Sequence, residues 1–213
     1  MRSLKESVME KTNTKEQILD VALELFSVRG YEATSISQIA EAVGIRKASL
    51  YSHYDGKQAI LDALVEKIID EYSRHSMFTK ADWDDPYFTK DKQNMTAEEA
   101  AAQVKGQIRY ILHDPKVSRA RKMLVIEQFA NPELSRMQTQ RNYTDVMSYH
   151  TGMMHFLMKN GTLKSGDAEL MAAEYCLPIS VWLNLCDREP EREAEVMALI
   201  EKHILHFFEM HKK

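Results

Sequence analysis

Hydrogen-bond donors are concentrated in one short segment, residues 46–54, with the sequence RKASLYSHY. Cationic, hydroxyl and imidazole side chains bind phosphate oxygens and the exposed edges of bases in nucleic acids. If the segment is a helix, Ala48, Leu50 and Tyr51 face its support and the donors face outward. A short helix of that composition can enter the major groove of DNA. The outward donors are Arg46, Lys47, Ser49, Ser52 and His53, and the hydroxyls of Tyr51 and Tyr54 add to them.

A second candidate anion site follows directly in the sequence. Asp55 and Gln58 have the spacing of a capping box, which predicts that a helix begins here, and Lys57 lies in its first turn. Free backbone N–H groups and the helix dipole attract anions at such a position. We therefore expect a DNA phosphate to bind beside Lys57.

Residues 36–43 are predicted to form the helix that supports this segment. Ser35 and Gln38 form a capping box before it. Gly44 stands where the helix must end, because glycine adopts the left-handed conformation without a steric penalty. Two short helices around such a turn are a helix-turn-helix. The apolar stripe of the first helix is Ile36, Ile39, Ala40 and Val43.

A longer helix is predicted to precede this pair. Thr14, with Gln17 completing a capping box, begins it, and Gly30 ends it. Residues 1–13 have no apolar face, so we expect a mobile arm there that can still touch DNA. The buried stripe of the helix is Ile18, Val21, Ala22, Leu25 and Phe26.

These helices resemble the DNA-binding domain of the tetracycline-repressor (TetR) family of bacterial transcription regulators. The matching stretches are ILDVALELFSVRGYEATSISQIAEAVGI, KASLYSHY and the helix start that contains Lys57 and Ile60, about a quarter of the chain. Arg46 stands where many members have a small cap residue, and it adds a contact to a phosphate or a base. Tyr54 stands where phenylalanine is usual.

The resemblance implies sequence-specific binding to double-stranded DNA. In family terms, Lys47 and Ser49 face bases or phosphates. Tyr51, His53 and Tyr54 face the sugar-phosphate backbone, and Lys57 meets the phosphate at the start of the next helix. The connection before residue 36 also meets backbone phosphate. The implied DNA-binding set is Thr34, Ser35, Arg46, Lys47, Ser49, Tyr51, His53, Tyr54 and Lys57.

The rest of the chain also has helical periodicity, and no strand pattern appears. We expect an all-α fold with a helix-turn-helix DNA-binding domain at 1–56 and an effector-binding and dimerisation domain at 57–213. The helix over 57–76 is expected to belong to both domains and to couple them. Beyond it, a loop is predicted at 80–95 and helices at 96–113, 116–130, 132–160, 167–187 and 190–211.

The last two predicted helices have more apolar surface than one subunit can cover. The helix over 167–187 is apolar nearly all round and contains Pro178, which should kink it, and Pro190 begins the last helix. An isologous two-fold contact is the commonest way to bury such faces, so we expect a homodimer through 167–187 and 190–211. Two recognition helices related by a two-fold axis imply a near-palindromic operator.

Methionines, aromatic rings and a few polar groups recur at helical spacing in the second predicted domain. Core packing explains any one of them, but together they suit an adaptable, largely apolar pocket. We expect an unidentified small, largely apolar effector that releases a repressor from its operator. His150, Tyr143 and Trp182 are the preferred contacts because each combines apolar bulk with a polar group. The candidates are Tyr110, Met123, Glu127, Phe129, Tyr143, Met147, His150, Met154, Trp182 and Asn184.

The net charge of −4 gives no general support for nucleic-acid binding, and a protein that only compacts DNA needs a basic excess. Residues 1–57 contain eight Lys or Arg and eight Asp or Glu, so the basic surface is local, at Arg46, Lys47 and Lys57. A helical DNA-binding protein without small-molecule control is an alternative. A helical enzyme is another, although no phosphate loop, nucleophile elbow or paired catalytic motif occurs.

No cofactor or metal is expected. Cys176 and Cys186 are ten residues apart on one predicted helix, about 15 Å, which is beyond the reach of a disulfide. His113, His150 and His155 lack ligand spacing, so metal sensing would require their convergence from distant positions. No apolar run reaches 18 residues and the first residues are too polar for a secretory signal, so a cytoplasmic protein without a membrane segment is expected.

Overall fold

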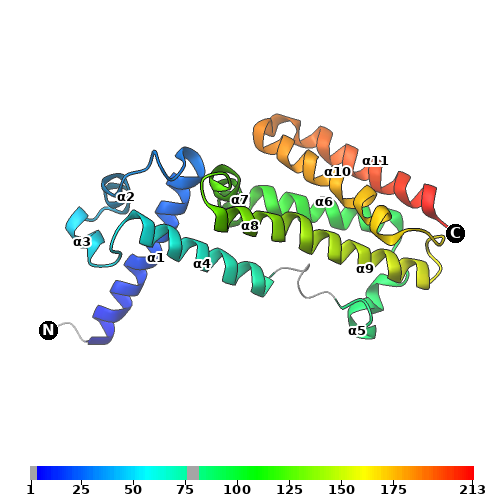
Figure 1. Cartoon of the computed structure of the whole chain (residues 1–213), viewed down its shortest axis with the longest axis horizontal. Helices are drawn as coiled ribbons and strands as arrows, with labels where there is room; N and C mark the ends of the chain where they lie inside the picture. The colour runs from blue at the N-terminus through cyan, green and yellow to red at the C-terminus, as the bar shows by residue number, and fades with distance from the viewer. Residues whose placement is uncertain (1–3, 76–81) are drawn as a thin grey trace. The chain divides into compact units, whose positions relative to one another are not determined.

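The structure is a computed structural model that describes residues 4–75 and 82–213. The regular elements of these residues are helices, and an isolated bridge between Leu163 and Lys212 is the one β-type pairing among them (Figure 1). The all-α prediction is confirmed.

The helices form two compact units, which we call the first unit (residues 1–75 and 118–138) and the second unit (residues 76–117 and 139–213). This division differs from the predicted boundary after residue 56, because α4 (Lys57–His75) lies wholly in the first unit. Helices α7 (Pro115–Glu127) and α8 (Pro132–Thr139) have residues in both units. The prediction that the helix starting at Lys57 is shared between the domains is therefore wrong.

Helix α1 (Leu4–Arg29) begins ten residues before the predicted start at Thr14. Residues 4–13 are thus helical, and the predicted mobile arm over 1–13 is wrong for them. Lys, Glu and Met are favourable helix formers, and a nucleated helix gains one hydrogen bond with each added residue. Helices α2 (Ile36–Val43) and α3 (Lys47–Tyr51) follow as predicted.

The helices of the first unit share one core. Ile39 of α2 and Leu50 of α3 are fully buried, at 0% exposure. Ile60 and Leu64 of α4 belong to the same buried cluster, and so does Met123 of α7. This common burial is the physical reason that α4 and residues 118–138 form one unit with the helix-turn-helix.

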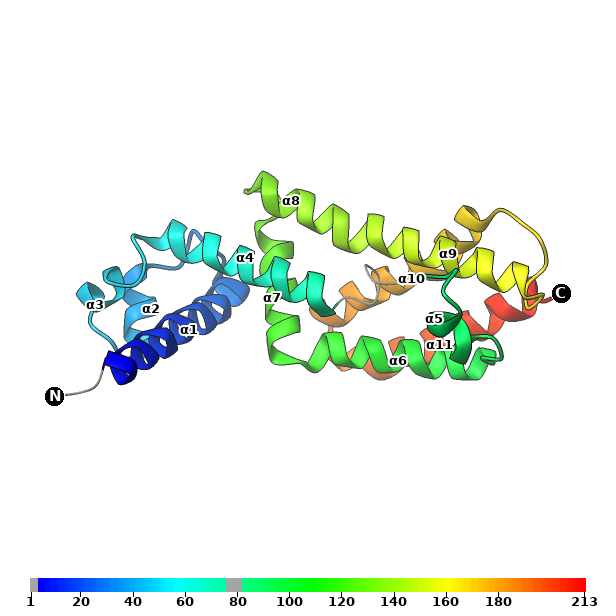
Figure 2. The ribbon, with the colours of Figure 1, turned by 90° about the horizontal axis from the view of Figure 1, so that it is seen from below.

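The second unit is built on four long helices: α6 (Ala97–His113), α9 (Asp145–Lys159), α10 (Ala168–Arg188) and α11 (Glu193–His211). In this unit α9 packs on α10, and α6 packs on α11 (Figure 2). Their shared core includes Met154, Tyr175, Ile200 and Phe207.

Two segments of the second unit differ from their predictions. The predicted loop at 80–95 contains the short helix α5 (Pro86–Thr89) and the 3-10 turn η1 (Lys90–Lys92), while residues 80 and 81 lie outside the described residues. The helix predicted over 132–160 is interrupted by a π-helical segment, η2 (Gln140–Thr144), between α8 and α9. A π-helical turn holds more residues than an α-helical turn, so it changes the face that the following residues present.

Candidate nucleic-acid interface

The start and the end of α2 have the predicted geometry. The Ser35 hydroxyl accepts a hydrogen bond from the Gln38 backbone N–H at 3.2 Å, and the Gln38 side chain accepts one from the Ser35 N–H at 2.8 Å. Gly44 has a φ of 79°, in the left-handed region, and the next N–H, that of Ile45, bonds the Ala40 carbonyl at 2.9 Å. These contacts fix the turn that leads into α3, and the predicted capping box is confirmed.

Helix α3 is anchored by Leu50, which is fully buried. Ala48 is exposed and Tyr51 is 46% exposed, so the prediction that these two side chains face the support is wrong. A helix of five residues has one inward position here, and the partly buried Ile45 and Tyr54 pack against the same core on either side of it.

The outward side of α3 carries the predicted donors. Arg46, Lys47 and Ser49 are exposed, and Arg46 makes no side-chain capping bond although it occupies the N-cap position. His53 and Tyr54 are half-buried in the turn after the helix. Burial raises the pKa of Tyr54, so its hydroxyl stays protonated and can donate. The structure therefore brings these predicted contacts onto one short helix and the turn that follows it.

Thr34 does not belong to this exposed set. It is 2% exposed, its hydroxyl donates to the Gly30 carbonyl at 2.8 Å, and its N–H donates to the Tyr31 carbonyl at 3.2 Å. Its hydrogen-bonding groups hold the turn between α1 and α2 and have no open face for a phosphate. The predicted DNA contact of the Thr34 side chain is therefore revised to a structural role.

Lys57 is also engaged inside the first unit. Its Nζ donates to the Tyr31 carbonyl at 2.7 Å and to the Glu32 carbonyl at 3.4 Å, and it lies 4.1 Å from the centre of the Tyr31 ring. The Gln58 carboxamide accepts from the Tyr31 hydroxyl and donates to Asp62, so the predicted capping box with residue 55 is wrong. The phosphate contact of Lys57 stays a prediction.

Three of the predicted effector contacts belong to the first unit, whereas the other seven belong to the second unit. Met123 is fully buried in the core of the first unit, whereas Phe129 is 91% exposed. Glu127 is buried and accepts a hydrogen bond from the Tyr31 N–H at 2.6 Å. These positions have helical spacing in the sequence, but spacing does not determine which core a helix joins.

The second-unit candidates are themselves divided. Tyr110 and Tyr143 are 55% and 57% exposed, Asn184 is exposed, and Trp182 packs edge-on against His203 with ring centres 5.4 Å apart. Met154 is a fully buried core residue.

His150 is the predicted contact with the most distinctive environment. Its Nδ1 lies 2.7 Å from the Val146 carbonyl, which makes Nδ1 the protonated nitrogen and leaves Nε2 as an acceptor. Burial lowers the pKa of His150 from 6.5 to about 4, so the ring is neutral near pH 7. Its ring lies 5.0 Å from that of Tyr149 and 5.5 Å from that of Tyr175. Met147, one turn earlier, contacts the Cys176 thiol at 3.8 Å.

An aromatic cluster around Trp83 was not predicted. The Trp83 ring lies 5.1 Å from Phe88, 5.1 Å from Tyr149 and 5.7 Å from Phe156. Its Nε1 is buried, and no hydrogen-bond partner for it is found in the described part of the chain. The indole fits over Gly152, where a Cβ would lie 2.3 Å from Trp83 Cδ1. A glycine inside a helix is unfavourable without such a reason, so Gly152 was the available sequence signal.

Both predicted dimerisation helices are present, with exposed apolar side chains. Leu170 and Val181 of α10 are 67% and 64% exposed, and Met210 of α11 is 54% exposed. Helix α10 continues through Pro178, and Asp167 caps its start. Helix α11 begins at Glu193, after the 3-10 turn η3 (Pro190–Arg192), and so starts three residues later than predicted.

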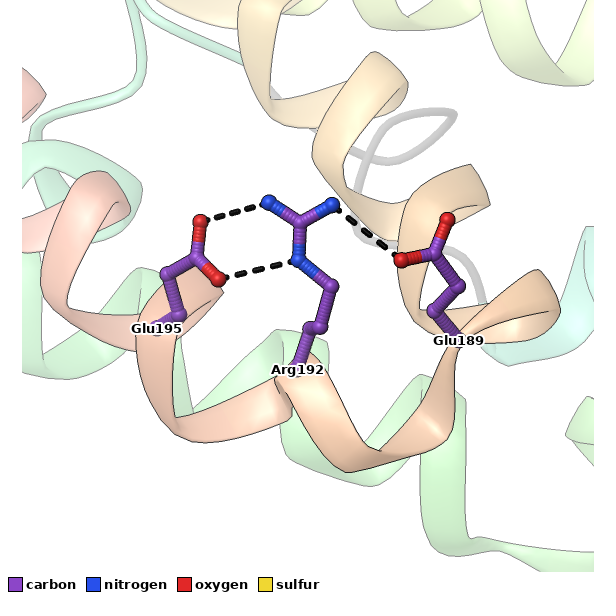
Figure 3. Close-up of polar contacts among 3 residues, drawn as sticks. All are labelled: Glu189, Arg192 and Glu195. Carbon is purple, nitrogen blue, oxygen red and sulfur yellow. Dashed lines mark hydrogen bonds and ion pairs between the residues drawn. The ribbon is translucent and has the colours of Figure 1, made fainter.

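Arg192 holds the turn between these two helices (Figure 3). Its Nε and Nη2 donate to the two carboxylate oxygens of Glu195 at 2.9 and 2.7 Å, and its Nη1 donates to Glu189 at 3.2 Å. The hydrogen bonds from Arg192 lower the pKa of the Glu195 carboxyl, and those carboxylates raise the pKa of Arg192.

No group of three or more His, Cys, Asp or Glu side chains suited to a metal occurs among residues 4–75 and 82–213. His113 pairs with Glu193 at 3.0 Å, on the side of α6 that meets α11. In the same described ranges, no helix is long and apolar enough to span a membrane.

Comparisons with known proteins agree with the geometry of the first unit. Residues 18–64, from α1 into α4, match the family of bacterial regulatory proteins called tetR. Over 61 residues the chain is 38% identical to the HTH-type transcriptional repressor KstR2 of Rhodococcus jostii (strain RHA1), covering 29% of this chain and 30% of KstR2. Over 56 residues it is 45% identical to IcaR of Staphylococcus aureus, the HTH-type negative transcriptional regulator of the biofilm operon icaADBC, covering 26% of this chain and 30% of IcaR. The match therefore spans less than a third of either relative's length.

The fold is similar to that of SmeT, the repressor of the Stenotrophomonas maltophilia multidrug efflux pump SmeDEF. The complex of SmeT with triclosan matches with a TM-score of 0.63 and 17% identity, covering 94% of this chain and 92% of SmeT. At this identity the likeness concerns the fold alone. Residues 18–64 thus match the tetR family of bacterial regulatory proteins, and the fold of the whole chain is similar to that of SmeT.

Proposed function

We propose that this protein is a sequence-specific DNA-binding transcriptional regulator and that α3 enters the major groove. The observation that carries the proposal is a capped α2 and a left-handed turn before an α3 that buries Leu50 and exposes Lys47 and Ser49. Cations and hydroxyls placed in this way bind phosphates and base edges. The proposed contacts are Ser35, Arg46, Lys47, Ser49, Tyr51, His53 and Tyr54, with Lys57 at the start of α4 as a phosphate contact.

Repression is the proposed outcome of DNA binding. The sequence matches support this direction, since KstR2 is a transcriptional repressor and IcaR is a negative transcriptional regulator. A protein bound at an operator that overlaps a promoter blocks transcription by occupancy, which needs no chemistry from the bound protein. The absence of a basic excess in the chain argues against general DNA compaction.

A homodimer through α10 and α11 is part of the proposal. The exposed Leu170 and Val181 on α10 and Met210 on α11 support it, because a two-fold contact removes such side chains from water in both copies at once. Two copies of α3 related by a two-fold axis would bind a near-palindromic operator.

The proposed effector is a small, largely apolar molecule that binds in the second unit near His150. The His150 ring lies among the aromatic rings of Tyr149 and Tyr175, and Met147 lies one turn earlier on α9, a combination that suits a largely apolar ligand. SmeT, of similar fold, has been solved in complex with triclosan. Ligand binding there is proposed to lower operator affinity.

Selection of random duplexes by the purified protein tests the DNA-binding proposal, and the expected result is an enriched inverted repeat. Lys47→Ala should weaken binding to that duplex by about 1 to 3 kcal/mol and relax its sequence preference. Lys90→Ala, at an exposed lysine of the second unit, is the matched control and should leave binding unchanged. If no inverted repeat is enriched, the proposal is wrong.

Light scattering of the same sample tests the dimer. Val181→Glu, at a 64% exposed position, should shift the protein toward the monomer without disturbing the core. Phe208 is less suitable because it contacts the rings of Tyr175 and Phe207. A monomeric unmodified protein at micromolar concentration would contradict the dimer.

Mass spectrometry of the purified protein under non-denaturing conditions tests for the effector. The mass of a co-purifying molecule would identify the ligand class. Titration of that molecule with and without operator then tests the coupling, since each ligand must weaken the other by the same factor. His150→Ala should reduce the ligand affinity and leave the operator affinity of the free protein nearly unchanged. Equal ligand affinities in both titrations would exclude coupling.

A further inference from the structure

The turn between α1 and α2 determines where the helix-turn-helix begins. Gly30 ends α1 with a φ of 80°, a left-handed conformation that other residues rarely adopt. Thr34 ties the far side of the turn back to Gly30 and Tyr31. Ser35, the next residue, is the N-cap of α2. The position of this turn therefore sets the position of α2.

Tyr31 connects the turn to two other helices through four groups. Its N–H donates to Glu127 Oε1 on α7 at 2.6 Å, and its carbonyl accepts from Lys57 Nζ on α4 at 2.7 Å. Its hydroxyl donates to Gln58 Oε1 on α4 at 3.0 Å. Its ring packs edge-on against Phe26 of α1, with ring centres 5.4 Å apart, and lies beneath Lys57. One residue, Tyr31, therefore positions the start of α4 relative to the start of α2.

Glu127 is the polar attachment of α7 at this place. It is the last residue of the helix and is 6% exposed, whereas its neighbours Ile126 and Phe129 are 44% and 91% exposed. The carboxylate lies directly against the turn, because a Cβ placed at Gly30 would be 3.4 Å from Glu127 Oε1, in van der Waals contact. A hydrogen bond from a backbone N–H to a carboxylate is stronger than one between neutral groups.

A second contact joins α7 directly to α1, at a position earlier along α7. Arg119 pairs with Glu24 of α1 at 3.3 Å. That pair is largely exposed, with both side chains more than a third open to solvent, so it contributes little. The Glu127 side chain is buried, and its hydrogen bond lies just after the end of α1, where the chain turns into α2.

We infer that Glu127 is a positioning residue for DNA binding: through the Tyr31 N–H it fixes the turn that sets α2 and α4. Helix α7 has its first residues in the second unit and its remaining residues in the first, so a displacement along α7 reaches the turn at Glu127. This inference rests on the proposed function and specifies how binding in the second unit would be transmitted to the DNA-binding helices.

Operator affinity gives the first test, with the duplex recovered from random selection by the unmodified protein. Glu127→Ala leaves the Tyr31 N–H without its partner and should weaken binding about tenfold or more. Glu127→Gln keeps an acceptor and should recover most of that loss. Glu133→Ala, at an exposed acid in the first turn of α8, is the matched control and should bind as the unmodified protein does.

Amide hydrogen exchange separates positioning from a general loss of stability. Coupling is reciprocal, so saturating operator should slow exchange in the last turn of α7, where the Gln128 N–H bonds the Leu124 carbonyl at 3.0 Å and the Asn131 N–H bonds the Glu127 carbonyl at 3.0 Å. Glu127→Ala should abolish this slowing even when operator saturates the variant, and Glu127→Gln should restore it.

Each outcome of these experiments is decisive. If operator protects α2 and α3 of the unmodified protein but leaves the last turn of α7 unchanged, the inference is wrong, whether or not the alanine variant folds. Equal protection of α7 in Glu127→Ala would also overturn it. If the unmodified protein selects no duplex at all, the proposed function fails instead, and the two failures are therefore distinguishable.

Discussion

In the first unit, the side chains that shape the candidate DNA interface are neighbours in the sequence, whereas in the second unit the side chains around His150 come from separate elements. Ser35, Gln38 and Gly44 fix the ends of α2 through contacts within a few residues. By contrast, His150 lies on α9, Tyr175 lies on α10, and Trp83, which packs on Tyr149, comes from the segment before α5.

This difference determines how the two regions respond to substitution. A capping residue or an exposed donor can be substituted without disturbing other contacts, and each such residue contributes about 1 kcal/mol to stability or binding. A buried ring or a close backbone approach affects every element that packs on it, because protein interiors are as dense as organic crystals. The four predictions below compare these two kinds of contact, beginning with the largest effect.

Acidification should destabilise the second unit through His150. Burial lowers its pKa from 6.5 to about 4, so between these values the unfolded chain binds a proton that the folded chain does not. The free energy of unfolding is therefore at its full value above about pH 6.5. It decreases as the pH falls toward about 4, by about 3 kcal/mol in total. Urea unfolding at about pH 7 and about pH 4.5 measures the change.

His150→Gln supplies the comparison for this experiment. The glutamine amide does not titrate and can donate to the Val146 carbonyl that His150 bonds at 2.7 Å. The variant should lose less stability than the unmodified protein over the same pH range. Identical pH dependence in both proteins would mean that His150 is not held neutral by burial.

Gly152→Ala should destabilise the second unit by about 1 to 3 kcal/mol, the usual cost of overpacking. The new Cβ would lie 2.3 Å from Trp83 Cδ1 and 2.9 Å from its Nε1, so the indole must move. Thermal unfolding measures the loss, and tryptophan fluorescence reports the displaced ring.

Gly106→Ala is the matched control, in the middle of α6, where nothing lies within 4 Å of an added Cβ. It should stabilise the protein by about 0.5 to 1 kcal/mol, because alanine is the better helix former. Opposite signs for the two substitutions support the close approach of Trp83, and equal signs contradict it.

Ser35→Ala should cost about 1 kcal/mol of stability, because the N–H of Gln38 loses the hydroxyl that it bonds at 3.2 Å. Arg46→Ala is the contrasting change at the N-cap of α3, where the side chain makes no capping bond. It should leave the free energy of unfolding nearly unchanged while weakening DNA binding. A comparable stability loss in both variants would refute the assigned difference between the caps.

The smallest effect is expected at Glu195. The hydrogen bonds from Arg192 lower the pKa of its carboxyl, so the pair contributes to stability above the unfolded pKa and this contribution is lost as the pH falls through the folded pKa. Both groups are exposed, so the change in unfolding free energy should be smaller than that of Ser35→Ala. Arg192→Ala should raise the pKa of Glu195 toward its ordinary value, which an NMR titration of the carboxyl measures.

Much of the first unit was predictable because its signals are local. Helix periodicity, the Ser35 box and the glycine at residue 44 depend on residues a few positions apart, and the structure confirms them. The start of α1 was missed because capping at Thr14 suggested a boundary where the upstream residues continue the helix. The boundary of the unit was missed because the core of α4 is completed by residues 118–138, far along the chain.

Two of the predicted functional residues contact a distant partner, Tyr31. Lys57 was predicted to bind a DNA phosphate, and in the structure its Nζ donates to the Tyr31 carbonyl, 26 residues away in sequence. Glu127 was placed among effector contacts, but it bonds the Tyr31 N–H across 96 residues. No rule based on sequence spacing connects positions so far apart, so the sequence did not predict either contact.

The sequence by itself determined that this protein is all-α, that it contains a helix-turn-helix with outward donors, and that it resembles the tetR regulators. These properties follow from side-chain periodicity, capping and glycine conformation, which are set by neighbouring residues. Only the tertiary structure decided that Lys57 and Glu127 meet at Tyr31, and that Trp83 lies over Gly152. Those contacts depend on which remote segments exclude water together, and burial then changes whether a polar group is free to bind a ligand or is already held by the protein.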